Sequence, residues 1–227
     1  MLWGVWIAAI CVDLGGLWFA FRLPGVSALS TADRTVDPGH RVERCGLSGI
    51  IALGESIIVT GATFAKLRWT PEVCSPFGST FVATGAMWWV YFVLSAEAAI
   101  EAFAHHKDRG EVARAGDAFG HLPIVAGIVA TKSDTMTLTQ PIGNITDAAL
   151  AVTLAGPALF LVGAGQFCRP VLSNPPISSA GGIVLLAGLR MLGPFVEPIW
   201  LNLSSRARMV CVAAWESLAQ RREQAVA

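Results

Sequence analysis

One carboxylate, Glu55, lies about halfway along an apolar stretch, residues 46–65, that is long enough to cross a membrane. An ionisable side chain inside a membrane span is costly, so it usually has a function or a buried partner. The functional interpretation is a proton or cation site. The alternative is a structural hydrogen bond that holds two helices together. Both interpretations predict that Glu55 faces the interior of a helix bundle, as do the nearby polar residues Ser56 and Thr60.

The residues before Glu55 belong to the same predicted helix. Five positions share one helical face: His40, Arg44, Leu47, Ile51 and Glu55. Arg44 and Glu55 are about 16 Å apart along the axis, so they cannot pair directly. Glu43 can reach His40 at the membrane surface. We therefore predict a surface helix that begins near Pro38, where a proline is tolerated, and runs into the span. His40, Glu43 and Arg44 join Glu55 as candidate binding residues.

A second candidate pair, Arg190 and Glu197, lies in the apolar stretch 180–198. The two residues are seven positions apart, which predicts one shared helical face. Pro194 lies between them and favours a kink, because proline leaves a backbone carbonyl without its helical partner. The pair can line a pathway, or it can be an inert ion pair near the interface. Asp13, in the first apolar stretch, is a further candidate whose side chain can equally extend to the membrane surface.

The composition predicts an all-α membrane protein. Of the 227 residues, 54% are hydrophobic and only 14% are charged, against about 25% charged in soluble domains. We expect one domain, residues 1–227, that forms a polytopic transmembrane helix bundle in the cell membrane, with the lipid bilayer as its partner. About seven spans are expected, or six if the last is not a span. They cover residues 2–21, 46–65, 77–96, 122–139, 148–167, 180–198 and 199–218.

The distribution of positive residues predicts the orientation of this bundle. Arginines and lysines are concentrated in the polar segment 22–44, in the loop 97–120 and after the last span. These parts of the chain are therefore expected to face the cytoplasm, as is the C-terminus.

Several kinds of function have no support in the sequence. We find no zinc-protease motif, nucleophile elbow or other catalytic constellation, so no enzyme activity, catalytic residue, metal ligand or cofactor is predicted. The formal net charge is zero, which gives no electrostatic footprint for nucleic acid.

Four segments, in this order, resemble the bacterial low temperature requirement protein A family. They are HRVERCGLSGIIALGES at 40–56, WWVYF at 88–92, HLPIVAGI at 121–128 and GPALFLVG at 156–163. The closing pair Trp215-Glu216 agrees as well, whereas Val93 stands where the family often has a polar residue. The resemblance implies a bacterial integral membrane protein. Because family members have additional spans before the first one here, the chain resembles a truncated member or the later part of one.

The leading functional hypothesis is a transporter-like or channel-like protein for a small solute, an ion or a proton. It rests on ionisable residues inside predicted spans, with Glu55 foremost. The alternative is a membrane-embedded binding, sensing or structural module in which the same residues fix helix packing or hold a ligand. A membrane enzyme is a remote third hypothesis.

Overall fold

The computed structural model describes residues 2–18, 38–95, 120–131, 138–140, 142–143, 146–168 and 177–226. These residues form α-helices and no strand, which confirms the predicted all-α class. The seven helices are α1 (Leu2–Trp18), α2 (Pro38–Phe64), α3 (Pro71–Trp89), α6 (Leu122–Ala130), α8 (Asp147–Cys168), α9 (Ile177–Leu192) and α10 (Pro198–Val226). A π-helical turn, η2 (Val90–Ser95), continues α3, and a 3-10 turn, η5 (Gly193–Phe195), follows α9.

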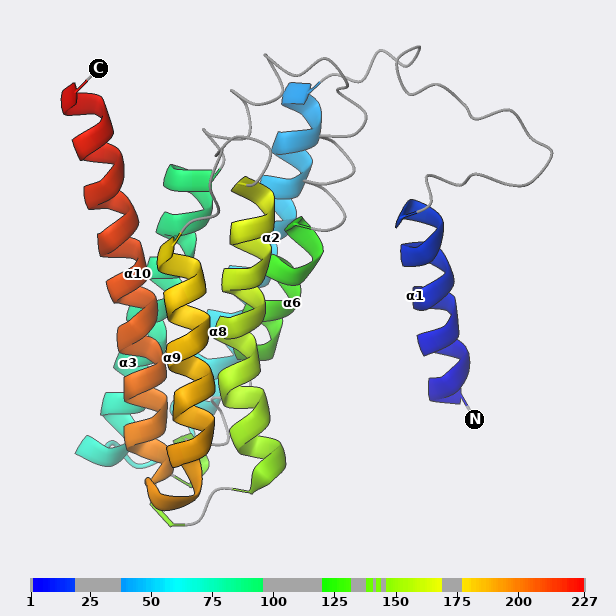
Figure 1. Cartoon of the computed structure of the whole chain (residues 1–227). Helices are drawn as coiled ribbons and strands as arrows, with labels where there is room; N and C mark the ends of the chain where they lie inside the picture. The colour runs from blue at the N-terminus through cyan, green and yellow to red at the C-terminus, as the bar shows by residue number, and fades with distance from the viewer. Residues whose placement is uncertain are drawn as a thin grey trace.

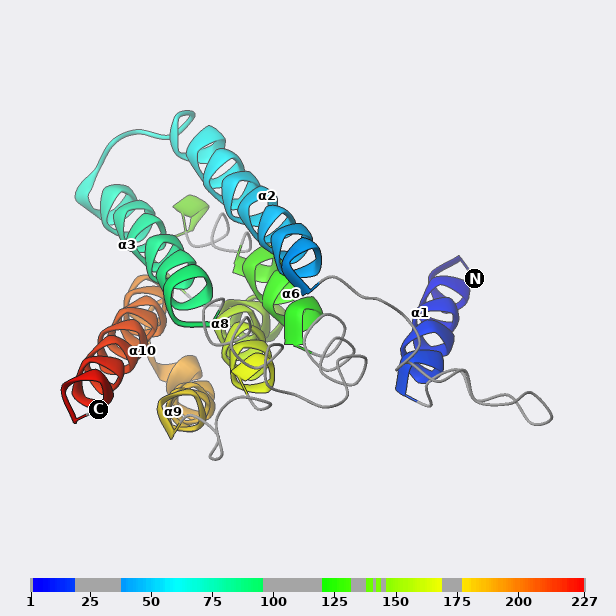
Figure 2. The same cartoon turned by 90° about the horizontal axis from the view of Figure 1, so that it is seen from above.

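Six of these helices form a closed ring. Around the ring, α2 packs on α3, α3 on α10, α10 on α9, α9 on α8, α8 on α6, and α6 on α2. Helix α10 also packs on α8. Figure 1 shows the six helices side by side, and both Figure 1 and Figure 2 show α1 apart from them. The ring places residues that are far apart in the sequence next to one another.

Prolines begin three of the described helices, α2, α3 and α10. Helix α2 starts at Pro38 and runs without a break to Phe64, which confirms the predicted helix that begins near Pro38 and continues into the apolar stretch 46–65. Helix α3 starts at Pro71, after Thr70 in an extended conformation. Proline suits a first turn, because its missing N–H would have no helical partner there.

Glycines allow α6 and α8 to approach closely. A Cβ atom added at Gly127 would lie 2.5 Å from Phe160 N, and one at Gly163 would lie 2.6 Å from Ile124 N. Gly182 of α9 is also in close contact, because a Cβ atom there would lie 2.7 Å from Cδ1 of Leu161 on α8. In contrast, nothing lies within 4 Å of a Cβ at Gly54 or Gly61.

The ring has an apolar exterior and an apolar core that also encloses polar residues. The core contains aliphatic and aromatic side chains around Phe160, Ile124 and Met209. Ten polar residues of the described part of the chain are buried with them: Ser56, Thr60, Thr80, Thr84, His121, Thr131, Thr153, Asn202, Ser205 and Arg206. Many large apolar side chains are exposed as well, among them Ile51, Ile58, Val184, Met191 and Trp200. Buried polar groups and exposed large apolar side chains are the two informative departures from the pattern of a helix bundle surrounded by water.

The expected spans correspond to the observed helices with some differences in length. Two helical segments of the described chain, Glu43–Phe64 and Asp147–Gln166, are long and apolar enough to cross a membrane. Helix α9 has an apolar but shorter segment, and α6 has nine residues. Helix α10 continues without interruption past Arg206 and Arg208. Residues 22–37 and 97–119, which hold most of the two predicted cytoplasmic segments, lie outside the described residues.

Candidate functional site

The Glu55 side chain does not face the core of the ring. It is exposed among the described residues, so the prediction of an inward-facing carboxylate is wrong here. The buried face of α2 contains Gly49, Ala52, Leu53, Ser56 and Thr60. At 3.6 residues per turn, Glu55 lies about a third of a turn away from the centre of that face.

The polar neighbours of Glu55 do face inward, as predicted. Ser56 Oγ lies 2.9 Å from the carbonyl oxygen of Ala52 and 3.2 Å from that of Ile128 on α6. Thr60 Oγ1 donates to the carbonyl oxygen of Ser56 at 2.8 Å. The inner face of α2 therefore carries two hydroxyl groups, and both form hydrogen bonds with backbone carbonyl oxygens.

The other predicted residues of α1 and α2 lie on the outside of the described structure. Glu43 and Arg44 are exposed on the first turns of α2, and Asp13 is exposed on α1. His40 is part of α2, but its side chain lies outside the described residues. The side chains of Glu43, Arg44 and Asp13 are therefore not brought into the interior of the ring.

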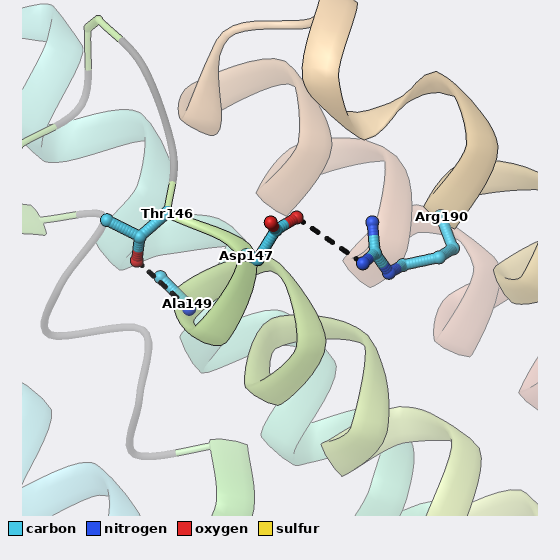
Figure 3. Close-up of polar contacts among 4 residues, drawn as sticks. All are labelled: Thr146, Asp147, Ala149 and Arg190. Carbon is cyan, nitrogen blue, oxygen red and sulfur yellow. Dashed lines mark hydrogen bonds and ion pairs between the residues drawn. The ribbon is translucent and has the colours of Figure 1, made fainter.

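Arg190 and Glu197 do not share a helical face, contrary to the prediction. Helix α9 ends at Leu192, and the 3-10 turn η5 with Pro194 separates the two residues. Arg190 instead contacts Asp147 at the start of α8, with Nη2 3.4 Å from Oδ1, as Figure 3 shows. Thr146 caps the same helix end, where its Oγ1 accepts from Ala149 N at 3.3 Å. Both partners of this ion pair are exposed, so it is an interfacial contact between α8 and α9.

The structure forms a different polar site from three residues of α2, η2 and α6. His121, at the N-cap of α6, lies between two hydroxyl groups. Its Nε2 is 2.7 Å from Ser48 Oγ, and its Nδ1 is 3.1 Å from Tyr91 Oη. Ser48 Oγ is also 2.9 Å from the carbonyl oxygen of Cys45. We call Ser48, Tyr91 and His121 the hydroxyl–imidazole chain.

Glycines of α2 make room for this chain. A Cβ atom added at Gly49 would lie 3.2 Å from Cε1 of Tyr91, and one at Gly46 would lie 3.4 Å from the ring of Phe92. The rings of Tyr91 and Phe92 pack edge to face, with centroids 4.8 Å apart. Because α2 lacks side chains at these two positions, the Tyr91 ring can approach α2 closely while its hydroxyl group contacts His121.

The hydroxyl–imidazole chain runs from the surface of the ring into its interior. Ser48 is exposed, His121 is 8% exposed and Tyr91 is 3% exposed. A hydroxyl group can donate and accept, and a neutral imidazole does both through its two nitrogens. The arrangement can therefore bind and pass on a proton.

A second polar cluster joins α3 and α10. Ser79 Oγ lies 3.1 Å from Oδ1 of the fully buried Asn202, and 2.9 Å from the carbonyl oxygen of Pro76. Ser205 and Arg206 are buried on the next turn of α10. Ser205 Oγ has no hydrogen-bond partner within the described part of the chain. The structure places Arg206 inside the ring, where it is 2% exposed.

Sequence reasoning singled out neither cluster. Ser48 and His121 are 73 positions apart, and Ser79 and Asn202 are 123 apart, so no local spacing connects them. The available signal was the position of His121 and Tyr91 within two of the four family-like segments. Among the described residues, no group of three His, Cys, Asp or Glu side chains could hold a metal ion.

Comparisons with known proteins identify the family of this chain. An uncharacterized protein of Rhizobium meliloti (strain 1021) is 32% identical over 219 residues, which are 95% of this chain and 53% of that protein. The chain thus spans about half the length of this curated relative. No solved structure matches. Residues 1–214 match the family described as bacterial low temperature requirement A protein, LtrA. The match confirms the predicted resemblance, and the chain belongs to the LtrA family.

Proposed function

We propose that this chain is a multi-pass membrane protein that moves a small solute or an ion in a transporter-like or channel-like manner. The observation that carries the proposal is the set of polar residues buried inside a ring whose exterior is apolar. Exposed aliphatic and aromatic side chains occur on every helix of the ring for which exposure is described, while His121, Asn202 and Arg206 are buried. Ionisable groups inside a membrane bundle commonly mark solute or proton pathways.

Two further observations support a membrane location. LtrA family membership and two helices of sufficient length and apolarity both favour it. Trp89, Trp200 and Trp215 are exposed on α3 and α10, and tryptophans are enriched where membrane proteins meet the headgroups. We extend the proposal to the orientation predicted from the positive residues, with the C-terminus in the cytoplasm.

The second candidate function is a membrane-embedded binding, sensing or structural module. It is favoured by the hydroxyl groups of the inner face, several of which bond backbone carbonyls or one another across helices. Ser56 joins α2 to α6 in this way, and Ser79 joins α3 to α10. We propose no catalytic role for either version of the function.

Flux through reconstituted vesicles decides between these candidates. The purified 227-residue chain is reconstituted, and uptake of protons, monovalent cations and small neutral solutes is compared with protein-free vesicles. Flux above the protein-free background supports the transport proposal. A chain that keeps its helical circular dichroism in the vesicles but gives no flux for any of these solutes refutes it and leaves the binding or structural module.

Glu55 variants then test the residue that the sequence singled out. If Glu55 carries protons or cations, Glu55→Gln abolishes flux and Glu55→Asp weakens it, while the fold is kept. If the carboxylate only holds helices together, Glu55→Gln is nearly silent, because an amide still forms hydrogen bonds across helices. Asp147→Asn is the matched control, since Asp147 is an exposed carboxylate on a different helix, α8, where it pairs with Arg190.

A further inference from the structure

We infer that the hydroxyl–imidazole chain is a proton-binding site, in which His121 takes up and releases a proton between Ser48 and Tyr91. The inference goes beyond the proposed function, because it assigns the ligand and the atoms and does not require transport. It rests on three distances: His121 Nε2 to Ser48 Oγ, His121 Nδ1 to Tyr91 Oη, and Ser48 Oγ to the Cys45 carbonyl oxygen.

The protons of the neutral site can be assigned from these contacts. The Cys45 carbonyl oxygen accepts only, so the Ser48 hydroxyl donates to it at 2.9 Å. Ser48 Oγ then accepts from His121 Nε2–H at 2.7 Å. With its proton on Nε2, the neutral ring has an acceptor at Nδ1, and the Tyr91 hydroxyl donates to it at 3.1 Å. The hydroxyl protons of Ser48 and Tyr91 and the Nε2 proton of His121 are thus each donated in a hydrogen bond.

The same contacts accommodate a charged ring. When Nδ1 also takes up a proton, the imidazolium donates through both nitrogens. The bond from Nε2 to Ser48 is unchanged, and the bond at Nδ1 reverses its direction once the Tyr91 hydroxyl rotates. Because both neighbours of the ring are hydroxyl groups, neither protonation state loses a hydrogen bond at the ring. A carboxylate or an ammonium in either place would favour one state.

The position of the chain gives the proton a route to the outside. Ser48 is exposed and lies five residues after Glu43, about 8 Å along α2 from the start of the candidate span. Tyr91 is buried at the other end and belongs to the π-helical turn η2, a local structure that is frequent at functional sites. The chain therefore connects the outer surface of α2 with the interior of the ring.

The protonation of His121 depends on the titratable and charged groups of the elements packed around it. Helix α2 contributes Glu43, Arg44 and Cys45 on the turns next to Ser48, with Glu55 two turns further on. The turn η2 contributes Tyr91. Residues 122–131 of α6 and 148–166 of α8, which packs on α6, contain no ionisable side chain. Among the described residues, the ring nitrogens of His121 contact the hydroxyl groups of Ser48 and Tyr91.

Nuclear magnetic resonance of the labelled chain in lipid nanodiscs tests the inference directly. Tyr91 is the single tyrosine of the sequence, so a tyrosine Cζ label gives one line without assignment. Ring ¹⁵N labels report the four histidines, and the His121→Gln variant identifies the signals of His121. The pH is varied from about 4 to about 9, around the ordinary titration range of histidine.

We expect the His121 ring to be the Nε2–H tautomer at high pH and to become doubly protonated reversibly as the pH falls. The Tyr91 line shifts with the same midpoint, since its hydroxyl changes from donor to acceptor. Ser48→Ala removes the acceptor of Nε2–H and changes the tautomer ratio about fivefold toward Nδ1–H. Ser79→Ala, which removes a hydroxyl from the cluster on α3, leaves all of these signals unchanged.

A His121 ring that keeps one protonation state over this range would overturn the inference, as would a Tyr91 line that ignores the titration of His121. The Tyr91 readout uses the unmodified chain, because Tyr91 is the single tyrosine, and so it does not depend on whether a variant folds. The flux assay fails independently: a titrating His121 without any flux refutes transport alone, and flux with a silent His121 refutes the proton site alone.

Discussion

Replacing Gly127 by alanine tests whether the close approach of α6 and α8 holds the ring together. The new Cβ atom would lie 2.5 Å from Phe160 N, 2.7 Å from Gly156 O and 2.9 Å from Phe160 Cα. All three are backbone atoms of α8, so no rotamer change relieves the overlap. The two helices have to separate by about 1 Å before the contacts return to ordinary van der Waals distances.

The size of the effect follows from this separation. A gap of about 0.5–1 Å forfeits a quarter to a half of the dispersion attraction between packed atoms, and overpacking in a core costs about 1–3 kcal/mol. Alanine is favoured over glycine within a helix by about 0.5–1 kcal/mol. Gly61→Ala, with nothing within 4 Å of its Cβ, shows this gain alone. Because this gain is common to both variants and cancels, we expect Gly127→Ala to be less stable than Gly61→Ala by about 1–3 kcal/mol.

Reversible unfolding in mixed detergent micelles, followed by far-ultraviolet circular dichroism, measures the two free energies of unfolding. Gly163→Ala is a second test of the same interface, because its Cβ would lie 2.6 Å from Ile124 N and 2.7 Å from Gly120 O. Equal unfolding midpoints for Gly127→Ala and Gly61→Ala would show that α6 and α8 are not packed as described, and the reasoning would then fail.

Three further predictions use the same unfolding measurement. Ser79→Ala removes the interhelical contact with Asn202 and should cost about 0.6 kcal/mol; an unchanged free energy would contradict the contact. Asp147→Asn breaks an ion pair whose side chains are 46% and 87% exposed, so the loss should stay below about 1 kcal/mol and decrease in high salt. A backbone hydrogen bond in the first turn of α3 lowers the pKa of Glu72 below 4.5, and a hydrogen bond with the Thr70 side chain lowers it further. A carboxyl group with a lowered pKa stabilises the folded state at pH values above its unfolded-state pKa. This stabilisation is lost as the pH falls through the folded-state pKa. Glu72→Gln should therefore reduce the pH dependence of stability below about pH 4.5, and an identical pH profile would refute this assignment.

The helices could be predicted from the sequence because each contains a long apolar run. The start of α2 at Pro38 was predictable for a local reason, since proline fits a first helical turn. The end of α9 was not. The sequence placed Arg190 and Glu197 on one helix, whereas Gly193–Phe195 form a 3-10 turn between them. A proline in an apolar run permits a kink or an end, and the local sequence does not distinguish the two outcomes.

The orientation of Glu55 was beyond the reach of periodicity. The spacing shows which residues share its helical face, but the neighbours of α2 decide which face is buried. Helix α2 packs on α3 and α6, and its buried residues include Gly49, Ser56 and Thr60. The hydroxyl–imidazole chain was missed for the same reason, because its three residues come from separate segments and acquire their chemistry only when the ring closes.

In the π-helical turn η2, the number of residues between Val90 and Ser95 matters for the structure as much as their types do. A π turn closes its hydrogen bonds over one residue more than an α turn, so the chain beyond Trp89 is out of phase with α3 before it. Deleting one residue from Val90–Ser95 would remove the wider turn and displace Tyr91 from its contact with His121. An alignment of relatives that places its gaps by helical periodicity would assign Tyr91 and Phe92 to the wrong sides of the helix. Insertions and deletions here should therefore be under stronger selection than conservative substitutions, although the segment lies within a helix of unremarkable composition.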